Sequence, residues 1–248
     1  MSTQSFYFGS GSIWGQTASG LPVRFGTVQG ISVDFSTTQK ELYGQNVFPE
    51  KVASASGKIT GKIKSAKVDG NLWNALFFGG SGATGSLMIA DAEAHSVPAA
   101  TPYTVTVTNS TKFVQDLGVR YAATGYPLQQ VASNPTVGQY SVAAGVYTFA
   151  AADASAAVLI DYTYTSVTGA QYTVTNQLQG TTPTFQLIAQ QGLSGQYDNM
   201  LLYACVSTKL SMASKMGDWN VPEFDFSAFA NAAGDVVQFN FPNQVPGA

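Results

Sequence analysis

The sequence has little charge. Asp, Glu, Lys and Arg make up 10% of its 248 residues, against roughly 25% in an average soluble domain. Between Tyr121 and Tyr197, the only charged side chains are Asp153 and Asp161. Apolar residues nevertheless make up 45% of the chain, which argues against disorder. A folded chain with so few surface charges suits a protein whose outer faces are covered by other copies of itself.

Reactive side chains are also scarce, because the chain has one histidine, His95, and one cysteine, Cys205. A Ser-His-Asp triad would have to use His95, and no nucleophile elbow surrounds any serine. Cys205 lies between Ala204 and Val206 in an apolar stretch, where a cysteine is more often a core residue than a reactive thiol. We therefore predict that the protein is not an enzyme and uses no cofactor.

Long apolar runs and a signal-like N-terminus are absent as well. Asn134, Pro127 and Pro135 interrupt the uncharged stretches, so none has the continuity of a membrane helix. Met1–Ser10 lack the pattern of a secretory signal peptide. The net charge of −3 is too small to indicate nucleic acid or an anionic membrane as a tight partner. We expect no membrane insertion by this chain and no export by a signal.

Alternation of apolar and polar side chains is the main pattern that is present. It occurs in Tyr103–Thr108 and in Val158–Thr165 and is typical of half-buried antiparallel strands. Near the C-terminus, the segments around Phe224 and Phe239 flank Asn231–Gly234, which predicts a hairpin about a turn. Regular strands separated by Gly and Pro favour a sandwich or barrel over a parallel α/β sheet.

One segment, about residues 70–79, is predicted to be helical. Asp69 is placed to cap it, Leu72 and Leu76 share one face, and Gly79-Gly80 supply a stop. The predicted fold class is therefore mainly β, a β-sandwich or barrel with one short α-helix.

Composition also marks possible domain boundaries. The proline-flanked segment 98–102 is one of them and Gly169 is another. We therefore predict a core of residues 1–96 and 169–248 that carries a β insertion over 97–168.

Lys58, Lys62 and Lys64 lie on one face of a predicted strand, opposite Ile59 and Ile63. This is either a solvated sheet face or a face that meets carboxylates of a neighbouring subunit, where complementary charge fixes register. Aromatic residues do not alternate with these lysines, so a role in binding single-stranded nucleic acid is disfavoured.

Asp91, Glu93 and His95 lie on one face if their segment is a strand. Such a group can hold a divalent cation, but it is more often a solvated or lumen-facing polar face. No second histidine completes a metal site, so we predict none. Asp91 and Glu93 are therefore grouped with the three lysines as a charged face toward a lumen or a subunit interface.

Four segments carry a family resemblance: Glu41–Lys64 (ELYGQNVFPEKVASASGKITGKIK), Asn71–Gly79, Asp116–Thr165 and Phe185–Phe229. The first two resemble the first half of tail tube proteins of contractile-tailed bacteriophages. The third is similar to a middle segment common in the same group of phage structural proteins, and the fourth resembles their closing strands.

The resemblance implies a β-sandwich subunit, the major subunit of the tail tube, that forms hexameric rings. Strands from six subunits would close an inner barrel, with the helix outside it, and stacked rings would form a conduit for the tape-measure protein and for transient, non-specific passage of DNA during ejection. The implied partners are further copies of the chain, the tail sheath, the baseplate or tail terminator, and the tape-measure protein. The implied location is the phage tail of the virion, after synthesis in the host cytoplasm.

The resemblance also implies a loop that acts between rings and subunits. Its residues are Leu42, Tyr43, Gly44, Gln45, Asn46, Val47, Phe48, Pro49, Glu50 and Lys51. Gly and Pro suit a sheet interior poorly, whereas the large apolar side chains of this segment are costly to leave in water. We therefore expect the segment to be mobile in a free subunit and ordered against the next ring.

Two hypotheses from other classes stay open. A phage decoration or adhesin β module would share the Thr-rich strands and the low charge. A carbohydrate-active enzyme would need paired carboxylates in a cleft, and the sequence identifies no such pair. Regular rings or tubes of the purified protein would favour the tail tube hypothesis over both.

Overall fold

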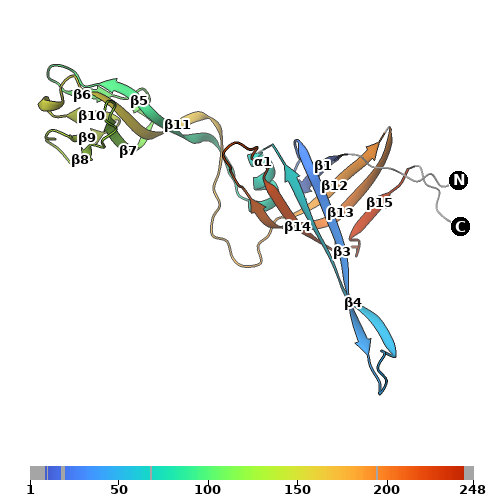
Figure 1. Ribbon diagram of the computed structural model, residues 1–248. Coiled ribbons are helices and arrows are strands. Elements are labelled where there is room, and N and C mark those ends of the chain that lie inside the picture. The colour runs from blue at the N-terminus through green and yellow to red at the C-terminus, as the bar shows by residue number, and fades with distance from the viewer. Residues whose placement is uncertain (1–8, 10, 18–19, 68, 194, 243–248) are drawn as a thin grey trace. The chain divides into compact units, whose positions relative to one another are not determined.

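The computed structural model describes residues 9, 11–17, 20–67, 69–193 and 195–242 (Figure 1). The described part of the protein is mainly β, as predicted, with 57% of the described residues in strands and one short helix of nine residues. Of the segment Met1–Ser10, for which no signal peptide was expected, residues 1–8 and 10 lie outside the described part. Within the described part, no helix is long and apolar enough to span a membrane.

The chain divides into two compact units. Unit 1 comprises Met1–Ser81 and Tyr172–Ala248, and unit 2 comprises Gly82–Gln171. The predicted insertion over 97–168 falls within the sequence of unit 2, and its functional assignment stays a prediction.

Unit 1 is built on one eight-stranded antiparallel sheet. Seven strands follow the order β2-β1-β12-β13-β14-β4-β3, and β15 pairs with β13. Their bounds are β1 Ser12–Thr17, β2 Val23–Arg24, β3 Val28–Leu42, β4 Lys51–Ser65, β12 Thr184–Leu193, β13 Gln196–Ser211, β14 Glu223–Phe229 and β15 Val237–Asn240. In the described part of the chain the sheet does not close into a barrel, because it ends at β2 on one side and at β3 on the other.

One face of this sheet carries the core of unit 1. Leu187 on β12, Leu202 on β13, Phe226 on β14 and Ile63 on β4 are all buried in it. Gly61 lies opposite Phe226 in the β4–β14 pairing. A Cβ at Gly61 would lie 2.3 Å from Cζ of Phe226, so the missing side chain makes room for this ring.

The predicted helix is present. α1 (Gly70–Trp73) continues into a single π-helical turn, η1 (Asn74–Phe78). The carboxylate of Asp69 accepts hydrogen bonds from two backbone amides of the first turn, at 2.9 and 3.3 Å. Gly79 ends the helix in the left-handed region, with φ of 62°. The cap and the stop read from the sequence are therefore both confirmed.

The helix lies against the core of unit 1. Leu72 and Leu76 are buried in the same cluster as the sheet side chains. Gly15 on β1 permits this approach, because a Cβ there would lie 2.5 Å from Cδ1 of Leu76. The hydroxyl of Ser207 on β13 donates a hydrogen bond to the carbonyl of Leu76, which fixes the C-terminal half of the helix to the sheet.

The predicted C-terminal hairpin is wrong. β14 pairs with residues 204–211 of β13, and β15 pairs with residues 199–202 of the same strand. Both run antiparallel to β13, so they follow each other along one of its edges in the same direction. The turn at Asn231–Gly234 does form, with a hydrogen bond of 3.0 Å. This turn connects β14 to β15, and β13, with 16 residues, is long enough to pair with both strands along the same edge.

Unit 2 has two sheets around a core of its own. The first has the order β5-β11-β7 and the second β6-β10-β9-β8. Their bounds are β5 Gly82–Ser96, β6 Thr104–Thr106, β7 Phe113–Tyr121, β8 Gln129–Gln130, β9 Gln139–Ala143, β10 Val146–Phe149 and β11 Ala157–Tyr172, with 3₁₀ turns η2 Ser110–Lys112 and η3 Ala151–Asp153. Side chains from both sheets form one buried cluster, which includes Val105, Val119, Tyr147, Ile160 and Tyr162.

Candidate functional site

A long two-stranded extension leaves the sheet of unit 1. β4 pairs with β14 only over 59–64, whereas β3 and β4 stay paired with each other from Ser36↔Lys58 to Leu42↔Lys51. We call residues 36–58 the arm; Figure 1 shows it projecting from the labelled strands β3 and β4. Every arm residue is exposed except the half-buried Pro49. No described part of the chain covers the arm. A two-stranded hairpin without a core is only marginally stable in water.

The ten residues of the predicted loop form the tip of the arm. Leu42 ends β3 and Lys51 begins β4, and the backbone amide of Glu50 donates to the carbonyl of Leu42 at 2.8 Å. The hydroxyl of Tyr43 donates to the carboxylate of Glu41. Large apolar side chains are exposed around the turn, Val47 by 88% and Phe48 by 81%. The sequence therefore located a real surface feature, an apolar tip that nothing in the described part of its own chain covers.

Lys62 and Lys64 meet carboxylates of their own chain. Nζ of Lys64 lies 2.9 Å from Oε1 of Glu223, and Nζ of Lys62 lies 3.0 Å from Oε2 of Glu223. Asp225 follows at 3.8 Å from Lys62. The hydrogen bonds from Lys64 and Lys62 lower the pKa of Glu223 to about 2. Lys58 lies on the arm, and no ion pair to it occurs among the described residues.

Asp91 and Glu93 are on β5 of unit 2, and the lysines are on β4 of unit 1. Ala92 between the two carboxylates has a φ of 55°, which breaks the regular strand, and Asp91 is exposed while Glu93 is half-buried. No group of three or more His, Cys, Asp or Glu positioned to hold a metal ion occurs in the described part of the chain.

The oxygens of Glu93 are occupied inside unit 2. They accept hydrogen bonds from the hydroxyl of Tyr162 at 2.6 Å and from the amide and hydroxyl of Thr108 at 2.8 Å. Nε2 of His95 lies 2.7 Å from the same carboxylate. Burial alone would raise the pKa of Glu93, but these hydrogen bonds outweigh it and lower the pKa to about 2. Glu93 therefore joins segments of unit 2 rather than presenting a charged face.

The two carboxylates of the charge-poor stretch have similar roles. Asp153 is buried and accepts hydrogen bonds from the hydroxyl of Tyr121 at 2.6 Å and from the amide of Gly138 at 3.2 Å. Burial and this bond to Asp153 raise the pKa of Tyr121 to about 12. Asp161 forms an ion pair with Arg120 across the β7–β11 pairing. Both carboxylates therefore bind groups of unit 2.

Asp116 on β7 joins the two sheets of unit 2. Its carboxylate accepts hydrogen bonds from the hydroxyls of Tyr140 at 2.5 Å and Tyr147 at 2.7 Å. Burial, followed by these hydrogen bonds, raises the pKa of both tyrosines. Two buried phenols thus share one acceptor. This pairing could not be predicted from the sequence, because the tyrosines are 24 and 31 positions from Asp116.

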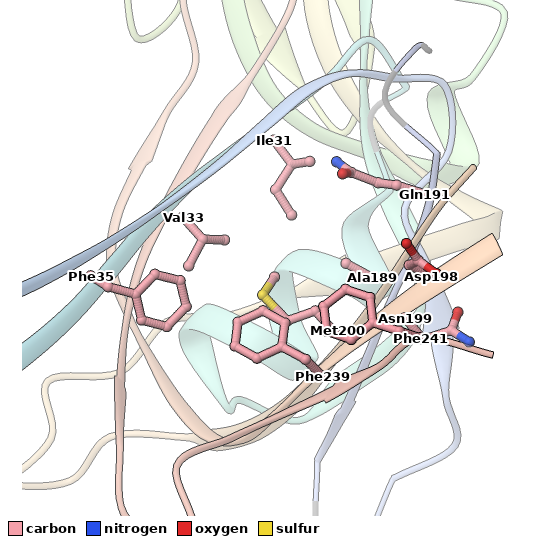
Figure 2. Close-up of a pocket in the computed structure, with 10 residues that line it drawn as sticks. All are labelled: Ile31, Val33, Phe35, Ala189, Gln191, Asp198, Asn199, Met200, Phe239 and Phe241. Atoms are coloured by element: carbon pink, nitrogen blue, oxygen red, sulfur yellow. The ribbon is translucent and has the colours of Figure 1, made fainter. Parts of the chain in front are cut away.

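An apolar groove of about 350 Å³ opens in unit 1 (Figure 2). Its lining residues are Ile31, Val33 and Phe35 of β3, Ala189 and Gln191 of β12, Asp198, Asn199 and Met200 of β13, and Phe239 and Phe241 at the C-terminal side. This groove was not predicted from the sequence, because the segment around Phe239 was expected to form a hairpin with the segment around Phe224.

Three aromatic rings remain partly in solvent in this groove. The ring centroid of Phe35 lies 5.8 Å from that of Phe239, and the ring of Phe239 stacks on Phe241 with an interplanar angle of 10°. The three side chains are 51%, 49% and 41% exposed, respectively. An apolar surface of this kind favours the binding of another apolar surface.

No protein-family model matches the sequence, and no curated protein matches it significantly. Conclusions about function therefore depend on the arm, the groove and the segments that carry the resemblance.

Proposed function

We propose that the protein is the major subunit of a phage tail tube, which assembles into stacked hexameric rings. The observation that carries this proposal is the arm, a two-stranded projection whose tip exposes Val47 and Phe48. Its tip is the segment that resembles the inter-ring loop of tail tube proteins. A two-stranded projection that is only marginally stable alone would gain order from contact with a neighbouring subunit.

Two further features of unit 1 support the proposal. The outer edge of β3 pairs with no other strand in the described part of the chain, and an open sheet edge invites pairing with another chain. The sheet of unit 1 would then contribute to a β-sandwich subunit and to an inner barrel that neighbouring copies close. A contact that closes laterally and repeats axially produces a tube of stacked rings.

The charge of the chain agrees with a conduit for DNA. Six copies at −3 each give −18 per ring, and a channel through which DNA passes freely should not be basic. In this proposal the tape-measure protein and then DNA pass through the lumen. The tail sheath and the baseplate or tail terminator contact the tube from outside and at its ends, and no catalysis is involved.

A phage decoration or adhesin module is the second candidate, and unit 2 is the observation that favours it. Unit 2 has two sheets and a core of its own, which suits a module that is exposed on the surface of a virion. The two candidates differ in whether unit 1 assembles without unit 2.

Sedimentation and electron microscopy of the full chain test the proposal. We expect rings or tubes as the protein is concentrated from micromolar to near-millimolar. A chain in which a short Gly-Ser linker replaces Gly82–Gln171 should still form them if unit 1 is the tube-forming part. A full chain that stays monomeric over the whole range contradicts the tube and leaves the decoration module.

A further inference from the structure

A further pocket of unit 1 lies where β2 leads into β3. Its volume is about 570 Å³, and its described lining consists of Gly11, residues 24–28 and Lys67. We call it the Arg24 pocket. Two of these lining residues are cationic, and none of them is acidic. In a chain whose net charge is −3, the Arg24 pocket is therefore a local concentration of positive charge.

Contacts with β1 hold the side chain of Arg24 in place. Trp14 lies opposite Arg24 in the β1–β2 pairing, and Cζ of the guanidinium lies 5.9 Å from the centroid of the Trp14 ring. Nη2 of Arg24 donates a hydrogen bond to the hydroxyl of Ser12 at 3.0 Å. A guanidinium has five N–H donors, so these two contacts leave most of its donors available to a ligand.

Lys67 approaches the same pocket over a glycine. A Cβ at Gly26 would lie 2.7 Å from Cδ of Lys67, so the missing side chain makes room for the aliphatic part of the lysine. The nearest carboxylate in the sequence, that of Asp69, accepts hydrogen bonds from the first turn of α1. Within the described residues, no ion pair involves Arg24 or Lys67. Both cations therefore line the pocket without a described counter-charge.

We propose that the Arg24 pocket binds a phosphate-type oxyanion. A pocket lined by charge of one sign raises the local concentration of counter-ions. The N–H groups of an arginine match two oxygens of one phosphate, and the ammonium of Lys67 supplies a second, less directional positive charge. Free phosphate and the backbone of DNA both present this chemistry. The site goes beyond the tail tube proposal and does not depend on it, because all of its described lining residues belong to one unit of a single chain.

Equilibrium dialysis of the full chain against radiolabelled inorganic phosphate tests the site. We expect uptake of about one phosphate per chain, with saturation at or below millimolar concentration. Sulfate should displace the labelled phosphate, whereas chloride at the same ionic strength should have little effect. Uptake that rises linearly with phosphate concentration overturns the proposal.

Two substitutions assign the binding to the pocket. Arg24→Gln and Lys67→Gln should each weaken phosphate binding by about tenfold or more, as for the loss of a charge-assisted hydrogen bond. Lys209→Gln removes a lysine of β13 that does not line the pocket; this matched control should bind as the wild type does. Melting followed by tryptophan fluorescence verifies that each variant is folded. Unchanged binding in both pocket variants overturns the proposal, as does an equal loss in Lys209→Gln.

A substitution that leaves the charge unchanged separates a built site from a general effect of charge. Gly26→Ala places a methyl group 2.7 Å from Cδ of Lys67, so the lysine side chain must move while both cations remain. Phosphate binding should weaken several-fold. Gly30→Ala is the matched control, because nothing lies within 4 Å of a Cβ there. Equal binding by the two alanine variants overturns the proposed site.

A short DNA duplex distinguishes the two sources of the ligand. Displacement of labelled phosphate by the duplex would identify a DNA phosphate as a ligand, and its failure would identify a free oxyanion; the site stands in both cases. The outcomes also separate the site from the proposed function. Tubes that bind no phosphate reject the site and leave the tail tube proposal standing. Saturable binding by a chain that forms no rings or tubes supports the site and rejects the tube.

Discussion

The two units of this chain use their few polar and many apolar side chains in opposite ways. In unit 2, Asp116 and Asp153 accept hydrogen bonds from tyrosine hydroxyls inside the unit, and the rings of Tyr140 and Tyr147 are buried. In unit 1, Phe35, Phe239 and Trp219 are exposed by 51%, 49% and 90%. The low charge of the sequence therefore accompanies different structural features in the two units. The carboxylates of Asp116 and Asp153 find their partners within unit 2, whereas unit 1 exposes aromatic side chains that other copies can cover.

The chain offers a convenient way to follow the two units separately. Its three tryptophans, Trp14, Trp73 and Trp219, all belong to unit 1. Tryptophan fluorescence therefore reports the unfolding of unit 1, while near-ultraviolet dichroism also includes the buried tyrosines of unit 2. The predictions below run from the largest expected effect on the free energy of unfolding to the smallest.

The largest effect is expected for Asp116→Ala in unit 2. The substitution leaves the buried hydroxyls of Tyr140 and Tyr147 without their shared acceptor, which should cost about 2–5 kcal/mol. The tyrosine signal should then be lost at lower denaturant while the tryptophan transition stays in place. Asp91→Ala, at an exposed position of the same unit, is the control. A joint shift of both signals would mean that the units do not unfold independently.

A smaller effect is expected for Gly61→Ala in unit 1. The added Cβ would lie 2.3 Å from Cζ of Phe226 and 2.8 Å from the carbonyl oxygen of Ser32, so the ring or the backbone must move, at about 1–3 kcal/mol. Gly57→Ala is a close control, because the same strand has nothing within 4 Å of a Cβ there. Tryptophan fluorescence should show an earlier transition for Gly61→Ala alone. Equal stability of the two variants would show that Phe226 is not packed on Gly61.

Acid should weaken unit 2 through Glu93. Its pKa is lowered from 4.5 to about 2 in the folded protein, so its stabilisation is complete above the unfolded pKa. The stabilisation is then lost as the pH falls from about 4.5 towards 2. Glu93→Gln should remove this part of the pH dependence, which we expect to be about 1–2 kcal/mol. Urea unfolding at a series of pH values measures it, and parallel curves for the two proteins would contradict the assignment.

Local signals explain which parts of the fold were predictable. Asp69, Leu72, Leu76 and Gly79 lie within eleven residues of one another, so the helix could be recognised from its own cap, face and stop. The strands followed from two-residue alternation in the same way. The π-helical turn left no recognisable pattern, because it depends on how the helix packs.

Long-range pairing explains what could not be predicted. Lys62 meets Glu223, which is 161 positions away, and nothing in either segment identifies the other. The groove depends on β15 pairing with β13 rather than with β14, and both pairings fit the same alternation of Phe224, Phe226 and Phe239. The tip of the arm was found because exposed apolar residues beside Gly and Pro are a local signal.

The smallest effect on folding is expected for the double variant Tyr43→Ser with Phe48→Ser. Both side chains are exposed on the arm, by 56% and 81%, and the arm has no core of its own. The free energy of unfolding of the monomer should change by less than about 0.5 kcal/mol. Stacking should nevertheless weaken, because the apolar tip is the part of the arm that a neighbouring ring would cover.

Sedimentation at increasing concentration measures the stacking, and thermal melting of the dilute protein measures the fold. Leu178→Ser removes an apolar side chain that is 86% exposed in unit 1 outside the arm, and it should change neither quantity. If the double variant instead unfolds the monomer, Tyr43 and Phe48 stabilise the core of unit 1. The arm would then be part of the folded core, and the contrast between the internally bonded carboxylates of unit 2 and the exposed aromatic side chains of unit 1 would rest on the groove and Trp219 alone.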